Sequence, residues 1–115
     1  SAQLIAQYIQ KLPPSLPVFV VGDLNSTPHS KAVEALLSAA PRHRLVDAKN
    51  QAGQKVYGPE GTFTGFNIQA QHIPTLDYIF INEHVDVLQF GSLSELWNGI
   101  LPSDHRPVIA EVVID

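Results

Sequence analysis

The sequence predicts a fold of the α/β (α+β) class, because segments with helical and with strand periodicity alternate along its 115 residues. The first third has the order helix, strand, helix, which is typical of proteins that pack helices on a sheet. The remainder carries strand-like runs at 76–81, 85–90 and 107–114. A chain of this length has room for one small domain with a modest core.

The first expected element is an amphipathic helix that Pro13 and Pro14 end, because proline cannot continue a helix. Three- and four-residue spacing of apolar side chains predicts this helix. The apolar stripe comprises Leu4, Ile5, Tyr8, Ile9 and Leu12.

A strand and a second helix follow. The apolar run at 18–21 is rich in β-branched and aromatic residues and favours a strand covered on both faces, which Gly22 ends. Thr27 as N-cap and Pro28 at the first helical position predict a helix start. The stripe of this helix comprises Ala32, Val33, Leu36, Leu37 and Ala40, and Pro41 ends it.

The later elements are less regular. Leu45 and Val46 favour a short strand, whereas the Gln-, Gly- and Pro-rich stretch from Asn50 to Gly61 predicts a loop. Thr62 to Thr64 favours β structure, with Thr62 and Thr64 interpreted as strand formers rather than catalytic groups. An irregular segment at 92–102 carries Trp97 and precedes the last strand.

Charge and composition restrict the function classes. A net charge of −4 and a pI of about 5.6 argue against nonspecific nucleic-acid binding through a basic surface. A phosphate substrate remains compatible, because a divalent metal can supply positive charge. The absence of cysteine excludes disulfides and thiolate metal sites but leaves the cellular compartment open. No apolar run approaches the roughly 20 residues that span a bilayer.

Polar residues interrupt the apolar runs at three places. Asp23 and Asn25 follow the strand at 18–21, so both would project from its carboxyl edge if the chain stays extended there. Ligands of open α/β sheets bind at such edges. The alternative for these two residues is an Asx turn that leads into the helix.

The other two polar motifs contain Asp77 and the pair Asp104–His105. Asp77 would begin the strand at 76–81, where a surface carboxylate that caps a turn is the alternative. A carboxylate that binds one ring nitrogen of His105 would fix the tautomer and raise its basicity. Asp77 and Asp104 are both candidates for that carboxylate, and Ser103–Asp104 could also be a simple turn.

Several familiar motifs are missing from the sequence. The five histidines show no His-x-x-x-His spacing that would predict a zinc helix. A phosphate-binding Gly-x-x-x-x-Gly-Lys loop and a Gly-x-Ser-x-Gly nucleophile elbow are also lacking.

The order of these motifs along the chain and the residues next to them resemble the C-terminal half of the endonuclease/exonuclease/phosphatase (DNase I-like) family. The resemblance covers the whole chain. It rests on Val20–Pro28, Gly61–Phe66, Leu76–Ile81 and Pro102–Val108. It implies half of a four-layer α/β/β/α sandwich, with one mostly antiparallel or mixed sheet and helices on one face. The segments at 61–66 and 76–81 are similar to those of bacterial members.

The resemblance also implies a chemistry, the hydrolysis of phosphate esters with Mg²⁺ or Mn²⁺, as in nucleases, phosphodiesterases and phosphatases. Asp23 resembles the residue that orients or deprotonates the attacking water, and Asn25 the contact to the scissile phosphate. His105 resembles the group that stabilises charge on phosphorus, oriented by Asp77. Asp104, with Asp23, would lie at the metal.

The family's N-terminal half normally supplies an Asn, a metal-binding Glu and another histidine, and the sequence shows no counterparts. We therefore expect residues 1–115 to be a single C-terminal half-domain, a fragment of a longer protein, with weak or no metal binding and little activity of its own. The alternative is a non-catalytic binding or scaffold module that retains the fold.

The expected partners are the missing N-terminal half and a phosphate-ester substrate. The sequence does not distinguish nucleic acid, phosphoinositide and phospholipid headgroup. A sheet face left bare without the other half would be a large apolar surface. We therefore also expect the fragment to self-associate.

Overall fold

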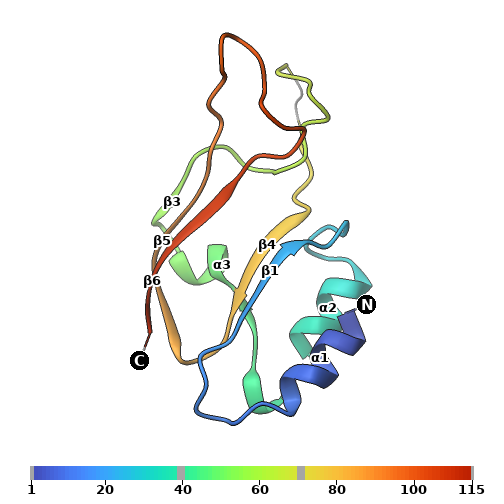
Figure 1. Ribbon diagram of the computed structural model, residues 1–115, viewed down its shortest axis with the longest axis vertical. Coiled ribbons are helices and arrows are strands. Elements are labelled where there is room, and N and C mark those ends of the chain that lie inside the picture. The colour runs from blue at the N-terminus through green and yellow to red at the C-terminus, as the bar shows by residue number, and fades with distance from the viewer. Residues whose placement is uncertain (1, 39–40, 70–71, 115) are drawn as a thin grey trace.

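The first of two sheets carries the motifs at Asp23 and Asp77. The computed structural model describes residues 2–38, 41–69 and 72–114 (Figure 1). In this sheet β4 (Asp77–Ile81) lies between β1 (Phe19–Asp23) and β2 (Val46–Asp47), and both pairs are antiparallel. The strands expected at 18–21, 45–46 and 76–81 are thereby confirmed.

The second sheet consists of β3 (Val56–Tyr57), β5 (Val85–Ser92) and β6 (Val108–Ile114), in the order β3-β5-β6. β5 and β6 are antiparallel, and β3 is parallel to β5. The expected mixed pairing is confirmed, but the strands form two sheets where the sequence suggested one. The reason is the short turn after Ile81, which carries the chain into the second sheet instead of back along β4.

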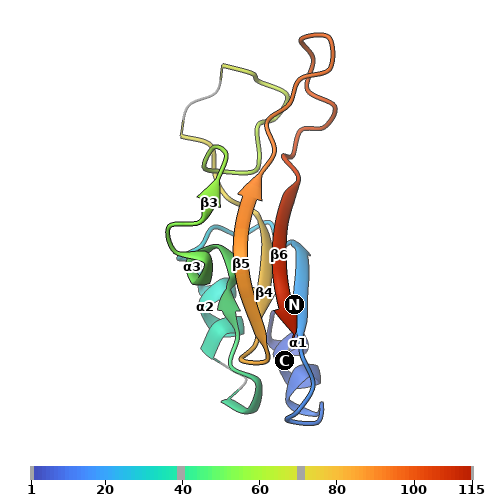
Figure 2. The same ribbon diagram turned by 90° about the vertical axis from the view of Figure 1, so that its left-hand side faces the viewer.

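Alternate residues of β4 face two different layers. Tyr78 and Phe80 pack with the helices on one face, in the same cluster as Leu36. Ile79 and Ile81 pack with β5 and β6 on the other face. Because strand side chains alternate between faces, this pattern gives three layers: helices, first sheet, second sheet (Figure 2). The two longer helices lie on one face of the first sheet, as expected, whereas the short helix at 48–52 lies on its other face.

Two helices form the outer layer, α1 (Ala2–Gln10) and α2 (Lys31–Ser38). α1 buries Ala6 and Ile9, whereas Leu4 and Tyr8 of the expected stripe are largely exposed. The predicted apolar stripe of α1 is therefore rotated relative to the buried face. The spacing of apolar residues alone does not show which side of the helix packs on the sheet.

The start of α2 also differs from the expectation. The helix begins at Lys31, with the Ser30 hydroxyl accepting from the Val33 N–H at 3.3 Å, so Thr27 and Pro28 lie before it. Ser30 takes the capping role because its oxygen reaches the free N–H groups of the first turn. Ala40 of the expected stripe lies outside the described residues.

The segment expected as a loop from Asn50 to Gly61 contains two elements. α3 (Ala48–Ala52) begins after Asp47, whose carboxylate accepts from the Lys49 N–H at 3.0 Å, and β3 follows. A helix of five residues is too short to show periodicity, so the sequence pattern missed it. Its buried Ala48 and Ala52 pack between the two sheets.

A buried amide joins the first sheet to the helical layer. Asn82 is 1% exposed; it accepts from the Val18 N–H and donates to the Leu16 carbonyl and to His43 Nδ1. His43, fully buried, places its other nitrogen 3.0 Å from the Leu12 carbonyl. Because both ring nitrogens of His43 have hydrogen-bond partners in the protein interior, we interpret His43 as a structural residue of the core.

The molecule is elongated, 46 Å by 28 Å by 20 Å, because two loops extend beyond the sheets at one end. We call this part, residues 58–69 and 93–107, the loop end; it lies at the top of Figure 1. None of the described helices has the length and apolar character needed to cross a bilayer. The loop end borders the place where β1 ends and β4 begins, which positions the site.

Candidate active site

Two carboxylates face each other where β1 ends and β4 begins. Asp23 and Asp77 are directly paired in the antiparallel register of these strands. The Thr62 hydroxyl fixes the start of β4, because it accepts from the N–H groups of Leu76 at 2.9 Å and Asp77 at 3.2 Å. Thr62 is thus an anchor of the site that the sequence interpretation treated only as a strand former.

The loop end brings His105 to these carboxylates. His105 Nδ1 lies 2.8 Å from Asp77 Oδ2, and His105 Nε2 lies 3.7 Å from Asp23 Oδ2. An ionised carboxylate only accepts hydrogen bonds, so Nδ1 carries the proton that it shares with Asp77. Of the two candidate carboxylates, Asp77 is therefore the one that holds the ring.

The imidazole of His105 also contacts the aromatic ring of Phe63. The rings of Phe63 and His105 are 5.1 Å apart between centroids and tilted by 58°. A β-bridge also joins the backbones of these two residues. Phe63 was not predicted as part of the site; the signals in the sequence are its place between two threonines and within the family-like segment Gly61–Phe66.

The carboxylates favour the charged form of the ring. The hydrogen bond that His105 donates to Asp77 raises the pKa of His105 above its ordinary value, partial burial opposes this, and the charges of Asp77, Asp23 and Asp104 raise it further. The side chains of His105, Asp23 and Asp77 are 27%, 35% and 17% exposed, so the group still faces solvent. The protonated ring of His105 can therefore donate a hydrogen bond from Nε2 to a bound anion.

Asn25 sits in a turn rather than in extended chain. Its φ of +50° is left-handed, and its N–H donates to Asp23 Oδ1 at 2.8 Å. Of the two possibilities left open for Asp23 and Asn25, the Asx turn is the one that forms, because the chain bends directly after Asp23 and does not stay extended. The turn keeps one oxygen of Asp23 bound and leaves Asn25 exposed at the rim of the site.

A buried tyrosine supports the same turn. The Tyr78 hydroxyl lies 2.7 Å from the Ser26 carbonyl and 3.1 Å from the Thr75 carbonyl and donates its proton to this pair. Burial raises the pKa of Tyr78 to about 12, with the charges of Asp47 and Asp77 adding to the effect. Tyr78 therefore stays neutral and holds the segment after Asn25 against β4.

Asp104 lies beside the group rather than in it. Its backbone carbonyl accepts from the N–H groups of Thr64 and Gly65 and from the Thr64 hydroxyl. Among the described residues, the atoms able to ligate a metal within 4.8 Å of one another belong to Asp23, Asp77 and His105. Carboxylate oxygens of this kind suit Mg²⁺, so Asp23 can act as a ligand; a metal-binding role for Asp104 remains a prediction.

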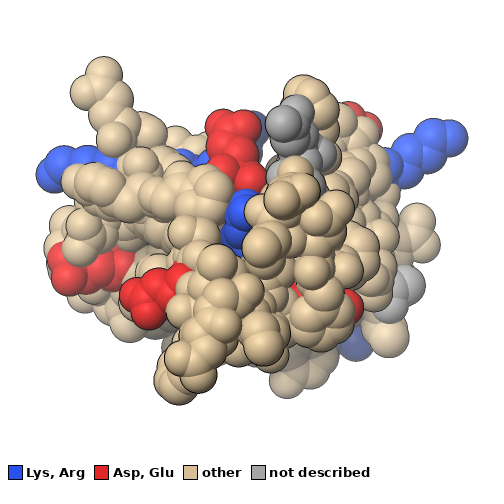
Figure 3. Space-filling model, turned by 90° about the horizontal axis from the view of Figure 1, so that it is seen from above, with Lys and Arg blue, Asp and Glu red and all other residues tan. Residues whose placement is uncertain are grey.

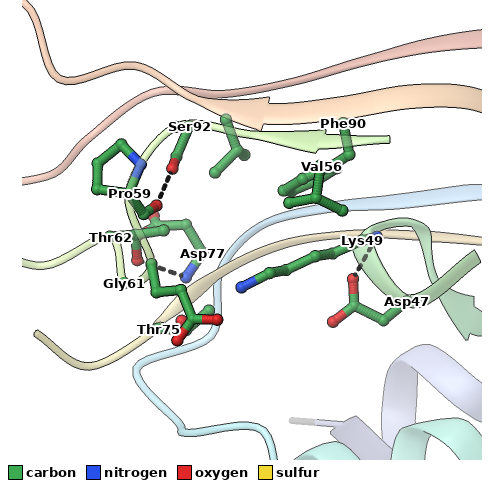
Figure 4. A pocket seen from close by; sticks show the side chains of 13 residues that line it. Asp47, Lys49, Val56, Pro59, Gly61, Thr62, Thr75, Asp77, Phe90 and Ser92 are labelled. Atoms are coloured by element: carbon green, nitrogen blue, oxygen red, sulfur yellow. Dashed lines mark hydrogen bonds between the residues drawn. The ribbon is translucent and has the colours of Figure 1, made fainter. Parts of the chain in front are cut away.

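Two hollows border Asp77, and one of them also borders His105, its hydrogen-bonded partner. On the solvent side, a groove of about 290 Å³ is lined by Val21, Gly22, Ser103 and Arg106 together with the pair. On the inner side, a cavity of about 20 Å³ lies between the sheets, and Lys49 reaches across it toward Gly61 and Asp77 (Figure 4). A space of that size holds about one water molecule. His105 lines the groove, so a substrate in the groove would meet the ring.

The comparison with known proteins agrees with this geometry. A model of the "Endonuclease/Exonuclease/phosphatase family" matches residues 2–105. The chain belongs to this family. No functionally curated protein sequence matches the chain.

Several solved structures have the family fold over nearly the whole chain. A conserved protein of unknown function from Enterococcus faecalis V583 is 28% identical over 97% of the chain, with a TM-score of 0.84. An endonuclease/exonuclease/phosphatase from Bacteroides vulgatus is 30% identical over 99%, also at 0.84. A mannosyl-6-phosphatase from Bacteroides thetaiotaomicron VPI-5482 is 25% identical over 98%, at 0.76.

The matched structures are much longer than this chain. The chain spans 42% of the Enterococcus and Bacteroides vulgatus proteins and 44% of the mannosyl-6-phosphatase. The site described above is thus what this segment of the family fold contributes.

Proposed function

We propose that the protein to which this segment belongs hydrolyses phosphate esters with the help of Mg²⁺ or Mn²⁺. The observation that carries the proposal is the placement of one imidazole between two carboxylates, Asp77 on Nδ1 and Asp23 near Nε2. A scaffold has no physical need for such a pair at the edge of a groove. The name of the mannosyl-6-phosphatase supports a phosphate ester as the substrate class.

Each residue has a distinct task in this reaction. Asp77 holds the tautomer in which Nε2 of His105 points to the groove, where the protonated ring stabilises charge on the phosphoryl oxygens. Asp23 orients the attacking water and accepts its proton, because its side chain is 35% exposed and only Oδ1 is held by the Asn25 N–H. Asn25 would contact the phosphate from the rim.

A divalent cation would supply the additional positive charge. Asp23 and Asp104 would hold it, and it would act as a Lewis acid on the phosphate oxygens. Mg²⁺ usually takes one or two carboxylates plus water and substrate phosphate. Two partly exposed carboxylates bind it weakly, so we expect the 115-residue chain alone to show no appreciable hydrolysis.

The test is the substitution His105→Ala in the longer protein. We expect the rate with bis(p-nitrophenyl) phosphate or p-nitrophenyl phosphate and Mg²⁺ to fall by about 10²–10⁴-fold, because charge stabilisation and proton transfer are lost. The variant should remain folded, with a loss of melting temperature that is largest below pH 6.5, where the protonated ring stabilises the fold. His29→Ala, at an exposed histidine after Asn25, is the control and should retain the rate. Unchanged turnover of the His105 variant would contradict the proposal.

A further inference from the structure

The loop end carries a third hollow, which is open to solvent and lies beside the groove. This loop hollow has a volume of about 170 Å³ and lies between the segment after Thr64 and the segment before Asp104. Arg106 lines both the loop hollow and the groove at His105, so the two spaces adjoin. A ligand whose phosphate lies at His105 could therefore extend its organic part into the loop hollow.

The lining combines apolar and hydrogen-bonding side chains. Ile68, Leu96 and Leu101 supply the apolar part, and Asn67 and Ser94 supply an amide and a hydroxyl. An apolar cavity of roughly 150 Å³ accepts a six-membered carbon ring. The size and the mixed lining therefore fit a six-membered ring that carries hydroxyl groups.

The charge of the loops selects among ligands. Residues 62–69 and 93–101 contain one charged side chain, Glu95. Seen from above, the loop end shows mostly uncharged residues (Figure 3). Nucleic acids and anionic lipid surfaces are bound by clustered Lys and Arg, so this surface matches a neutral ligand better than either.

Backbone hydrogen bonds hold the segments that carry the lining residues of the loop hollow. Trp97 and Ile100 bond each other in both directions, at 2.8 Å and 3.0 Å, around Asn98 and Gly99. The φ values of +53° and +77° at these two residues are those of a tight hairpin turn. On the other wall, the carbonyl of Asp104 accepts from the N–H groups at 64 and 65. These bonds fix the backbone on both sides of the hollow, so its shape does not depend on a ligand.

Arg106 forms the border between the two spaces. Its Nη1 donates to the carbonyls of Glu60 and Gly61 at 3.1 Å and 3.3 Å. Its Nε is buried without a hydrogen-bond partner among the described residues. The guanidinium is thus held by backbone carbonyls between the loop hollow and the groove. Its positive charge there would attract the phosphate group of a ligand that occupies both spaces.

We propose that the loop hollow binds the hydroxylated six-membered ring of a sugar phosphate. The ring would pack against Leu96 and Leu101, with Asn67 and Ser94 bonding its hydroxyl groups and the phosphate at His105. The orientation toward His105 rests on the proposed function, whereas binding of the ring does not.

The test uses the ¹⁵N-labelled 115-residue chain in NMR titrations with three probes in the presence of MgCl₂. Glucose should shift the amides of Asn67, Ser94 and Leu96 and the indole signal of Trp97, the only tryptophan. Inorganic phosphate should shift the ring signals of His105 alone. Glucose 6-phosphate should shift both sets and bind at least about 10-fold more tightly than glucose, or about 1.4 kcal/mol.

Two variants check the location. Ser94→Phe fills the loop hollow and should abolish the glucose shifts while leaving the phosphate shifts at His105. Ser15→Phe adds the same ring at an exposed position before β1 and should retain both. If Ser94→Phe disturbs signals outside 93–101, Leu96→Ala replaces it, because removing an apolar wall should weaken glucose binding about 10-fold without adding bulk.

The outcomes separate the two proposals. Glucose shifts without any phosphate shift at His105 would leave the ring site standing and count against the proposed hydrolase site. Phosphate shifts at His105 without glucose shifts would overturn the ring site alone. Shifts of the same amides by phosphatidylcholine vesicles or by AMP, with none by glucose, would assign the loop hollow to lipid or nucleotide and also overturn it.

Discussion

At the residue scale, the site depends on how a single imidazole is shared between two carboxylates. The sequence could show that a histidine and several aspartates follow or precede apolar runs, but it left both Asp77 and Asp104 as partners of His105. Asp104 is adjacent in the chain, yet its carbonyl is used to anchor the loop at Thr64. Asp77, 28 residues away, reaches the ring because the loop folds back onto the start of β4.

The charge on His105 gives a pH-dependent contribution to stability. Because Asp77 raises the pKa of the folded state above the unfolded value of about 6.5, the protonated ring stabilises the fold fully below that value. This contribution is lost as the pH rises through the folded pKa. We expect Asp77→Asn to lower the NMR-measured pKa of His105, because the ring loses its hydrogen bond to a charged carboxylate. Asp86→Asn, an exposed change on β5, should leave it unchanged; an equal pKa in the Asp77 variant would contradict the pairing.

At the scale of elements, long apolar runs were predictable and short anchored segments were not. β1, β4, β5 and β6 follow from runs of apolar and β-branched residues, whereas α3 and β3 depend on a cap at Asp47 and on pairing with β5. The loop around Gly61 is also invisible to periodicity. It places Thr62, which fixes the start of β4, through a backbone contact that only the folded chain provides.

Gly61 allows a close approach that no other residue could make. Its φ is +85°, and a Cβ there would lie 2.2 Å from the Ile73 carbonyl oxygen. Gly61→Ala must displace the loop and with it Thr62, so we expect the free energy of unfolding to fall by about 3 kcal/mol. Gly53→Ala is the matched control, since φ is +63° there but the space is open. It should cost about 1 kcal/mol in urea denaturation; an equal loss in both variants would rule out the clash.

At the scale of the whole molecule, the second sheet covers only part of the first. Ile79 and Ile81 of β4 are packed beneath it, but β1 is the outer strand, and its Phe19 and Val21 are 41% and 63% exposed. The sequence led us to expect one entire bare face. In the structure, the exposed apolar surface of the first sheet is limited to the inner side and free edge of β1. The outer side of β6, where Ile109 is exposed, is a second exposed apolar surface.

We expect the 115-residue chain to self-associate through β1. The strand offers backbone groups on its free edge and two apolar side chains on one face, a combination that favours pairing with another strand. Val21→Lys places a charge on that face and should shift the distribution in sedimentation velocity and light scattering toward monomer. Tyr8→Lys changes an equally exposed residue on α1 and should not. A monomer at low micromolar concentration for the unaltered chain would exclude this surface as an interface between copies.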